Sequence, residues 1–238
     1  SDLLELPKAQ RLVIAMLHQA GKRVVFVNCS GCAIAMVPET ENAEAILQAW
    51  YPGERGGEAV AKVLFGEVNP SGKLPVTFYK SVNDLPDFLD YTMKNRTYRY
   101  FKGEPLFPFG YGLSYTSFEY GKPTLMQVKS KKRVSKASDY RLMFSLQNTG
   151  KREGTEVAQV YIKRIDDVDG PIKSLKAFKR VSLEAGERQM VSIDLPRKSF
   201  EGWDAQTNTI RVVSGTYQVF VGGSSADAAK AKIEVKIR

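Results

Sequence analysis

The first third of the chain carries helical and strand patterns of apolar residues in turn. Apolar residues recur at helical spacing between Pro7 and Gly21, and a short run rich in β-branched residues follows from Arg23 to Asn28. The first pattern predicts an amphipathic helix and the second a strand buried on both faces. Further along, the patterns predict helices over Ala43–Trp50 and Glu58–Phe65 and a strand over Lys73–Tyr79. This order predicts that residues 1–80 form part of an α/β domain with a parallel sheet.

Only about two strands are visible in residues 1–80, which is too few to close a sheet. The chain also opens on Leu3-Leu4-Glu5-Leu6-Pro7, without an initiator Met or a signal-peptide pattern. We therefore expect that this chain is a piece of a longer protein whose preceding segment supplies the other strands.

From about residue 118 the helical patterns stop and apolar and polar residues alternate. Alternation over four to eight residues, interrupted by Gly and Pro, is typical of short strands in a β-sandwich. Residues 118–238 are therefore expected to form a fibronectin type III-like sandwich, and the absence of a Cys…Trp…Cys pattern excludes an immunoglobulin disulfide core. The predicted strands are Tyr140–Asn148, Glu156–Lys163, Lys176–Leu183, Arg188–Leu195, Thr216–Val221 and Lys232–Ile237.

Residues 81–117 show little periodicity but many aromatic side chains, which is unusual for a solvated linker. We expect them to form a packed strap that lies across the two domains.

The net charge also differs between the two halves of the chain. The chain has 238 residues with 35 Lys and Arg and 26 Asp and Glu, and its net charge of +9 arises within residues 118–238. A basic cluster, Lys129–Lys136, is expected to be a solvated loop, with an electrostatic dock for acidic polysaccharide or a cell-envelope surface as the alternative. Because no groove-entering helix or stacking aromatic adjoins it, nucleic-acid binding is not expected. No apolar run approaches the ~18–20 residues of a membrane-spanning helix.

The cysteines form a single C-x-x-C pair, Cys29 and Cys32, and His18 is the only histidine. A tetrahedral zinc site needs four N or S ligands, so no metal site is expected. A redox dithiol is the alternative to two structural thiols, but the residues after Cys32 are a weak start for the helix that a thioredoxin-type pair requires.

Several strings of residues occur in one order that resembles the C-terminal part of glycoside hydrolase family 3, the β-glucosidase and β-xylosidase family. Each string alone is weak, but together they cover essentially the whole chain in collinear order. In the first half they are Trp50–Gly57, Val63–Phe78, Thr97–Phe101 and Pro108–Thr116. In the second half, resembling the family's fibronectin type III-like domain, they are Asn148–Gly150, Gly154–Tyr161, Leu175–Phe178 and Gly222–Ser225.

The resemblance implies an N-terminal TIM-like barrel, an α/β sandwich domain and the fibronectin type III-like domain. This chain would begin inside the α/β sandwich, so residues 1–80 would be its C-terminal portion, residues 81–117 the interdomain strap and residues 118–238 the β-sandwich. Retaining glycosidases use two carboxyl groups ~5–5.5 Å apart. The family places the nucleophilic Asp on the barrel and the acid/base Glu on a loop just upstream of Ser1, so Glu5 is not that residue. No catalytic residue is expected in this chain, and the family's chemistry needs no cofactor.

Five residues are candidates for a sugar pocket or a domain interface. Asn28 and Ser30 follow the end of a predicted strand, where open α/β sheets build their sites. Arg96, Tyr98 and Arg99 offer groups that suit carboxylates and sugar rings, and domain packing is the alternative for them. Trp203 could stack on a sugar, with packing at the sandwich edge as the alternative.

These observations predict the C-terminal, largely structural part of a retaining β-glycosidase that removes terminal non-reducing β-D-glucosyl or β-D-xylosyl residues from oligosaccharides. The alternative is a stand-alone carbohydrate-binding or adhesion module. Expected partners are the oligosaccharide substrate and the missing barrel, and the isolated fragment is expected to self-associate. A periplasmic or secreted location is expected for the parent.

Overall fold

The computed structural model describes residues 4–128 and 139–237. The basic cluster Lys129–Lys136 lies outside these described residues. The described chain divides into two compact units. The N-terminal unit comprises Ser1–Val68, Pro75–Thr97 and Phe101–Phe109, and the sandwich unit comprises Asn69–Leu74, Tyr98–Tyr100 and Gly110–Arg238.

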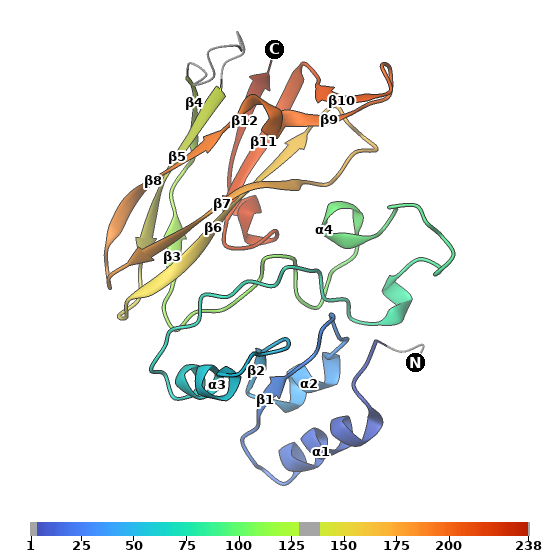
Figure 1. The fold of residues 1–238 in the computed structure, drawn as a ribbon, viewed down its shortest axis with the longest axis vertical. Helices are drawn as coiled ribbons and strands as arrows, with labels where there is room; N and C mark the ends of the chain where they lie inside the picture. Colours follow the sequence, from blue (N-terminus) through green and yellow to red (C-terminus); the bar gives the residue numbers. More distant parts are fainter. Residues whose placement is uncertain (1–3, 129–138, 238) are drawn as a thin grey trace. The chain divides into compact units, whose positions relative to one another are not determined.

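The N-terminal unit is an α/β structure built around two short parallel strands (Figure 1). Strands β1 and β2 pair in register from Val25 with Ala45 to Asn28 with Gln48. Helix α1 begins directly after Pro7, which the first turn of a helix tolerates. The elements are α1 (Lys8–Gln19), β1 (Val25–Asn28), α2 (Val37–Asn42), β2 (Ala45–Gln48), α3 (Gly56–Leu64) and the 3₁₀ turn η1 (Val82–Asp84), and the short helix α4 (Thr97–Tyr100) follows.

The helix predicted over Ala43–Trp50 is wrong. Helix α2 ends at Asn42, and Ala45–Gln48 form strand β2 instead. An apolar run of this length fits a helix and a buried strand equally well by periodicity alone. Parallel pairing with β1 decides for the strand, because it satisfies the backbone polar groups of both segments.

The strand predicted over Lys73–Tyr79 is also wrong. Pro75 interrupts the segment and lacks the N–H that a strand ladder needs. Around this break, the N–H of Leu74 donates to the carbonyl of Tyr111 at 2.8 Å, and Phe78 forms an isolated antiparallel bridge with Phe107. The segment is therefore extended, but it pairs through isolated residues and forms no continuous strand ladder.

The sandwich unit consists of two antiparallel four-stranded sheets (Figure 1). One sheet has the order β12-β11-β6-β7. In the other, β5 pairs with β8 on one edge and with β3 and β4 on the other edge. All six strands predicted from the alternation form, with bounds that shift by at most a few residues. The strands are β3 (Phe118–Tyr120), β4 (Thr124–Val128), β5 (Asp139–Asn148), β6 (Gly154–Arg164), β7 (Ser174–Leu183), β8 (Arg188–Leu195), β11 (Gly215–Gly222) and β12 (Ala231–Ile237).

The sandwich core comes directly from the alternating pattern. On β5, Tyr140, Leu142, Phe144 and Leu146 are buried and the residues between them are not. Because successive side chains of a strand point to opposite faces, this pattern fixes which face of the sheet is buried. Each such buried aliphatic or aromatic side chain contributes about 1.5–3 kcal/mol relative to exposure. These side chains belong to a buried cluster of apolar residues that both sheets of the sandwich unit contribute to.

A short hairpin and two 3₁₀ turns complete the sandwich unit. Strands β9 (Glu201–Asp204) and β10 (Thr209–Val212) pair antiparallel as a separate two-stranded sheet. The turns are η2 (Arg197–Phe200) and η3 (Asp227–Lys230). Among the described residues, no helix has the length and apolar character needed to cross a membrane.

Candidate functional site

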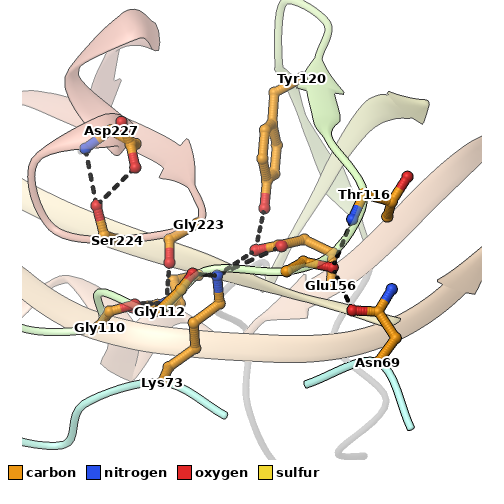
Figure 2. Close-up of polar contacts among 12 residues, drawn as sticks. Asn69, Lys73, Gly110, Gly112, Thr116, Tyr120, Glu156, Gly223, Ser224 and Asp227 are labelled. Carbon is orange, nitrogen blue, oxygen red and sulfur yellow. Dashed lines mark hydrogen bonds and ion pairs between the residues drawn. The ribbon is translucent and has the colours of Figure 1, made fainter. Parts of the chain in front are cut away.

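A buried ion pair joins two distant parts of the sandwich unit. The Lys73 ammonium lies 3.1 Å from Oε1 and 3.4 Å from Oε2 of Glu156 on β6. It also donates to the carbonyl of Gly112 at 3.0 Å. The side chains of Lys73 and Glu156 are only 14% and 5% exposed, so both charges are largely withdrawn from water. Figure 2 shows the Lys73 side chain reaching Glu156 from a segment outside the sheets.

Tyr120 of β3 completes this arrangement. Its hydroxyl donates to Glu156 Oε1 at 3.1 Å (Figure 2). Burial raises the pKa of the Tyr120 hydroxyl, and the negative charge of Glu156 raises it further, so the hydroxyl stays a donor. Both oxygens of Glu156 are therefore engaged, which suits a structural cross-link rather than a proton-transfer group. We refer to Lys73, Gly112, Tyr120 and Glu156 as the Lys73–Glu156 cluster.

Two further side chains hold the same segments in place. Asn69 Oδ1 accepts from the Ser114 hydroxyl at 2.9 Å and from the Tyr115 N–H at 2.8 Å, and its Nδ2 donates to the Glu153 carbonyl at 2.8 Å. Gln159 Nε2 donates to the carbonyls of Gly110 at 3.1 Å and Gly223 at 2.6 Å. Residues 69–74 and 110–116 are thus fastened to the sandwich by side chains on both sides.

Two glycines of the Pro108–Thr116 string allow this close approach. Gly110 has φ +80°, and a Cβ there would lie 2.1 Å from Gln159 Oε1. A Cβ on Gly112 would lie 2.1 Å from the backbone carbonyl oxygen of Gly72. A larger residue at Gly110 would be strained by the positive φ and would displace the Gln159 side chain. One at Gly112 would push the Gly72 backbone away. The spacing of these glycines is therefore explained by the path of residues 69–74 and 110–116.

In the N-terminal unit, Asn28 and Ser30 form one buried polar network with Gln48. Asn28 Nδ2 donates to Gln48 Oε1 at 2.6 Å and to Ser30 Oγ at 3.0 Å, while Ser30 Oγ donates to the Cys32 carbonyl at 3.0 Å. Asn28 and Gln48 are register partners at the carboxyl ends of β1 and β2. The network therefore lies at the end of the sheet where open α/β folds place their sites.

The other three sequence candidates are anchored separately. Arg96 donates to the backbone carbonyls of Thr92, Asp87 and Asp90 at 3.2, 2.9 and 2.6 Å, and so holds that loop together. The Tyr98 hydroxyl accepts from the Leu175 N–H at 3.0 Å, and its ring meets the Tyr161 ring edge-on with the centroids 5.9 Å apart. The Arg99 guanidinium lies 5.7 Å from the centroid of the Tyr100 ring.

The thiols of Cys29 and Cys32 are both exposed and not bonded to each other. Helix α2 begins only at Val37, so Cys32 does not start a helix as a thioredoxin-type pair requires. Within residues 4–128 and 139–237, no group of three His, Cys, Asp or Glu side chains is placed to hold a metal ion.

Sequence reasoning did not assign a role to Lys73, Tyr120 or Glu156, although Lys73 and Glu156 lie in the quoted strings. The available signal was a single carboxylate within the otherwise alternating strand Glu156–Lys163. A charge is rarely buried in such a strand unless it is paired. The identity of its partner, 83 positions away, was not predictable from local pattern.

Comparison with known families matches both units. Residues 1–115 match the glycosyl hydrolase family 3 C-terminal domain, and residues 156–225 match the fibronectin type III-like domain. The two matches occur in the order that the sequence strings predict.

Individual relatives match almost the whole chain. It is 49% identical over 237 residues to a xylan 1,4-beta-xylosidase of Xylanibacter ruminicola, covering 98% of this chain and 26% of that protein. It is 36% identical to a periplasmic beta-glucosidase of Salmonella typhimurium, covering 98% of this chain and 31% of that protein. A crystal structure of a β-glucosidase from Streptomyces venezuelae in complex with D-glucose superposes with a TM-score of 0.87 at 31% identity, covering 99% of this chain and 31% of that one. The chain therefore spans about a quarter to a third of the length of these relatives.

Proposed function

Because this chain belongs to the C-terminal region of glycoside hydrolase family 3, we propose that it forms the C-terminal scaffold of a retaining β-glycosidase. The complete enzyme removes terminal non-reducing β-D-glucosyl or β-D-xylosyl residues from oligosaccharides. The observation that carries the proposal is the collinear match of both units to relatives named beta-xylosidase and beta-glucosidase.

The contribution of this chain to that activity is structural. Residues 69–74 and 110–116 adjoin, in sequence, the segments that build the N-terminal unit. The Lys73–Glu156 cluster and Asn69 hold these two segments on the sandwich. They thereby fix the path of these two segments along the sandwich unit.

Both catalytic carboxylates lie outside residues 1–238 in this proposal. Retention needs a nucleophile and an acid/base ~5–5.5 Å apart. The family supplies the first from the barrel and the second from a loop just before Ser1. The buried carboxylate of Glu156 is no substitute for either group, because its oxygens already bind Lys73 and Tyr120.

The sequence-based site residues keep a supporting role. Asn28 and Ser30 border the sugar pocket of the complete enzyme, positioned by the polar network with Gln48. Arg96, Tyr98 and Arg99 serve as interface residues in the strap. The division into residues 1–80, 81–117 and 118–238 stays our proposed domain assignment.

The proposal predicts that the purified chain of residues 1–238 does not hydrolyse aryl β-D-glucosides or β-D-xylosides. The physical reason is the lack of the nucleophile and the acid/base. Release of the aryl group is followed by absorbance, with a complete family member as the positive control. Turnover that copurifies with the folded chain and survives repurification would contradict the proposal.

The isolated chain is also expected to self-associate. On α1, Leu12, Val13, Met16 and Leu17 are between 42% and 58% exposed. Adjacent apolar side chains on one short helix favour burial against another protein surface. Sedimentation velocity at increasing protein concentration should show dimers or larger species, and substituting Leu12 and Met16 by Gln should reduce them. A monomer at all concentrations would show that this surface does not drive association.

The location proposed for the complete enzyme is periplasmic or secreted. One similar protein, from Salmonella typhimurium, is named a periplasmic beta-glucosidase.

A further inference from the structure

A cleft in the sandwich unit is not accounted for by the scaffold role. It has a volume of about 470 Å³. Small-molecule sites in proteins occupy about 300–1,000 Å³, are concave, and combine aromatic side chains with a few polar groups. The cleft lies among α4, the ends of β6 and β7, and the hairpin β9–β10, and its charged and aromatic lining includes Arg99, Lys163, Arg164, Asp167, Asp169, Lys176, Glu201 and Trp203.

Trp203 provides a rigid aromatic surface at this cleft. Its side chain is 55% exposed although tryptophan usually buries most of its surface. The next residue, Asp204, accepts hydrogen bonds from Thr207 Oγ1 at 2.8 Å and from Arg211 Nε at 2.5 Å, which ties the two strands of the hairpin together. The backbone that carries the indole is therefore ordered before any ligand arrives, which lowers the entropic cost of binding.

Positively charged side chains also line the cleft. Lys176 is partly buried, and its ammonium donates to the backbone carbonyl of Glu201 at 3.3 Å. Burial lowers the pKa of the Lys176 ammonium, and the charge of Arg99 lowers it further, while Glu201 opposes this. Lys163 also lines the cleft, and its charge lowers the pKa of the neighbouring Lys173. Within the lining, the positive charges of Arg99 and Lys176 thus act on each other.

Among the described residues, none of the acidic groups of the lining forms an ion pair with Lys163 or Lys176, although the charge of Glu201 acts on Lys176. Asp167 is engaged with Arg164, whose Nη2 lies 3.3 Å from Asp167 Oδ2. The other two carboxylates, Asp169 and Glu201, belong to exposed residues. In the part of the chain that the structure describes, neither Lys163 nor Lys176 is joined to a carboxylate by an ion pair. Partly buried lysines without an ion-pair partner favour the binding of an anion.

We infer that this cleft binds a sugar that carries a carboxylate, namely a uronic acid residue of an oligosaccharide. The apolar face of the sugar ring packs on Trp203, and its carboxylate accepts hydrogen bonds from Lys176 and Lys163. A neutral sugar uses only the aromatic surface and leaves the lysines unpaired. The inference concerns the sandwich unit alone and does not depend on the proposed glycosidase activity.

Binding is tested with the full chain by titration calorimetry. The ligands are a xylo-oligosaccharide bearing one glucuronic acid branch, the unbranched oligosaccharide of equal length, and inorganic phosphate. A hydrogen bond to a charged group lowers Kd by roughly tenfold or more. The branched ligand should therefore bind at least about tenfold tighter than the unbranched one. Equal affinity for both oligosaccharides would overturn the uronic acid assignment, and phosphate binding as tight as that of the branched ligand would reduce the cleft to an anion site.

Four variants locate the site. Trp203→Ala and Lys176→Met should each weaken binding of the branched ligand by about tenfold or more. Ile210→Ala removes the exposed cross-strand partner of Trp203, and Lys236→Met removes an equal charge from an exposed position on β12. Both control variants should bind as the unchanged chain does. If Ile210→Ala weakens binding as much as Trp203→Ala does, the effect comes from hairpin stability and not from the cleft. If Lys236→Met weakens binding as much as Lys176→Met does, the effect comes from net charge.

A spectroscopic measurement gives an independent readout. The chain contains only two tryptophans, Trp50 and Trp203, so Trp50→Phe leaves Trp203 as the sole indole. Its fluorescence should change on titration with the branched oligosaccharide in proportion to the calorimetric saturation. An unchanged Trp203 spectrum at saturating ligand would contradict stacking on this residue.

Discussion

Replacing Glu156 by Ala is expected to destabilise the sandwich unit by about 3–5 kcal/mol. The Lys73 ammonium would then remain 14% exposed without its counter-charge, and Tyr120 would lose the acceptor of its hydroxyl. Removing one partner of a buried ion pair is costly because the other charge is left uncompensated. Lys73→Met should have an effect of the same sign, since it isolates the buried carboxylate.

The double variant Lys73→Met/Glu156→Leu separates an electrostatic cause from a packing cause. Replacing a whole buried ion pair by apolar residues is often nearly neutral, so the double variant should recover most of the loss. Arg141→Met provides the control within the sandwich unit, because its pair with Asp194 is 38% and 54% exposed and should contribute little to stability.

Hydrogen exchange is the suitable measurement for these variants. Protection of the β6 and β11 amides reports opening of the sandwich unit separately from the N-terminal unit. A single variant at Glu156 that leaves this protection unchanged would show that the cluster does not hold the sandwich together.

Much of the sandwich unit could be predicted from the sequence because its signal is local and repeated. Alternation places Leu142, Phe144 and Leu146 on one face of β5 wherever the strand lies, so the strand and its buried face follow from the same pattern. The predicted strands Arg188–Leu195 and Lys232–Ile237 formed for the same reason.

The errors occur where the structure depends on partners distant in sequence. Residues Ala45–Gln48 become a strand because β1 is beside them, and no property of their own periodicity distinguishes that outcome from a helix. The segment Lys73–Tyr79 has strand-like composition, but Pro75 denies it a ladder.

The residues of the candidate sites also differ in whether local sequence or the fold of the whole unit determines their partners. Asn28 and Ser30 were identified from the place where a strand ends, and the structure joins them in one network with Gln48. The Lys73–Glu156 pair joins segments 83 positions apart, and its prediction would have required the fold of the whole unit.

A chimeric enzyme tests the central claim that this chain is a family 3 scaffold. Residues 1–238 would replace the matching region of the Xylanibacter ruminicola relative, with which they share 49% identity. Under our proposal, the part of that relative outside the replaced region would supply the catalytic carboxylates, and this chain would complete the domains around them. Two controls are the relative truncated before the replaced region and the chimera carrying Glu156→Ala.

The decisive measurement is kcat/KM of the chimera for an aryl β-D-xyloside. The account predicts a value within about tenfold of that of the intact relative, which corresponds to about 1.4 kcal/mol in the activation free energy. It also predicts no turnover by the truncated relative and reduced thermal stability of the Glu156→Ala chimera. A folded chimera without activity, or a truncated relative that is as active as the intact enzyme, would contradict the scaffold role.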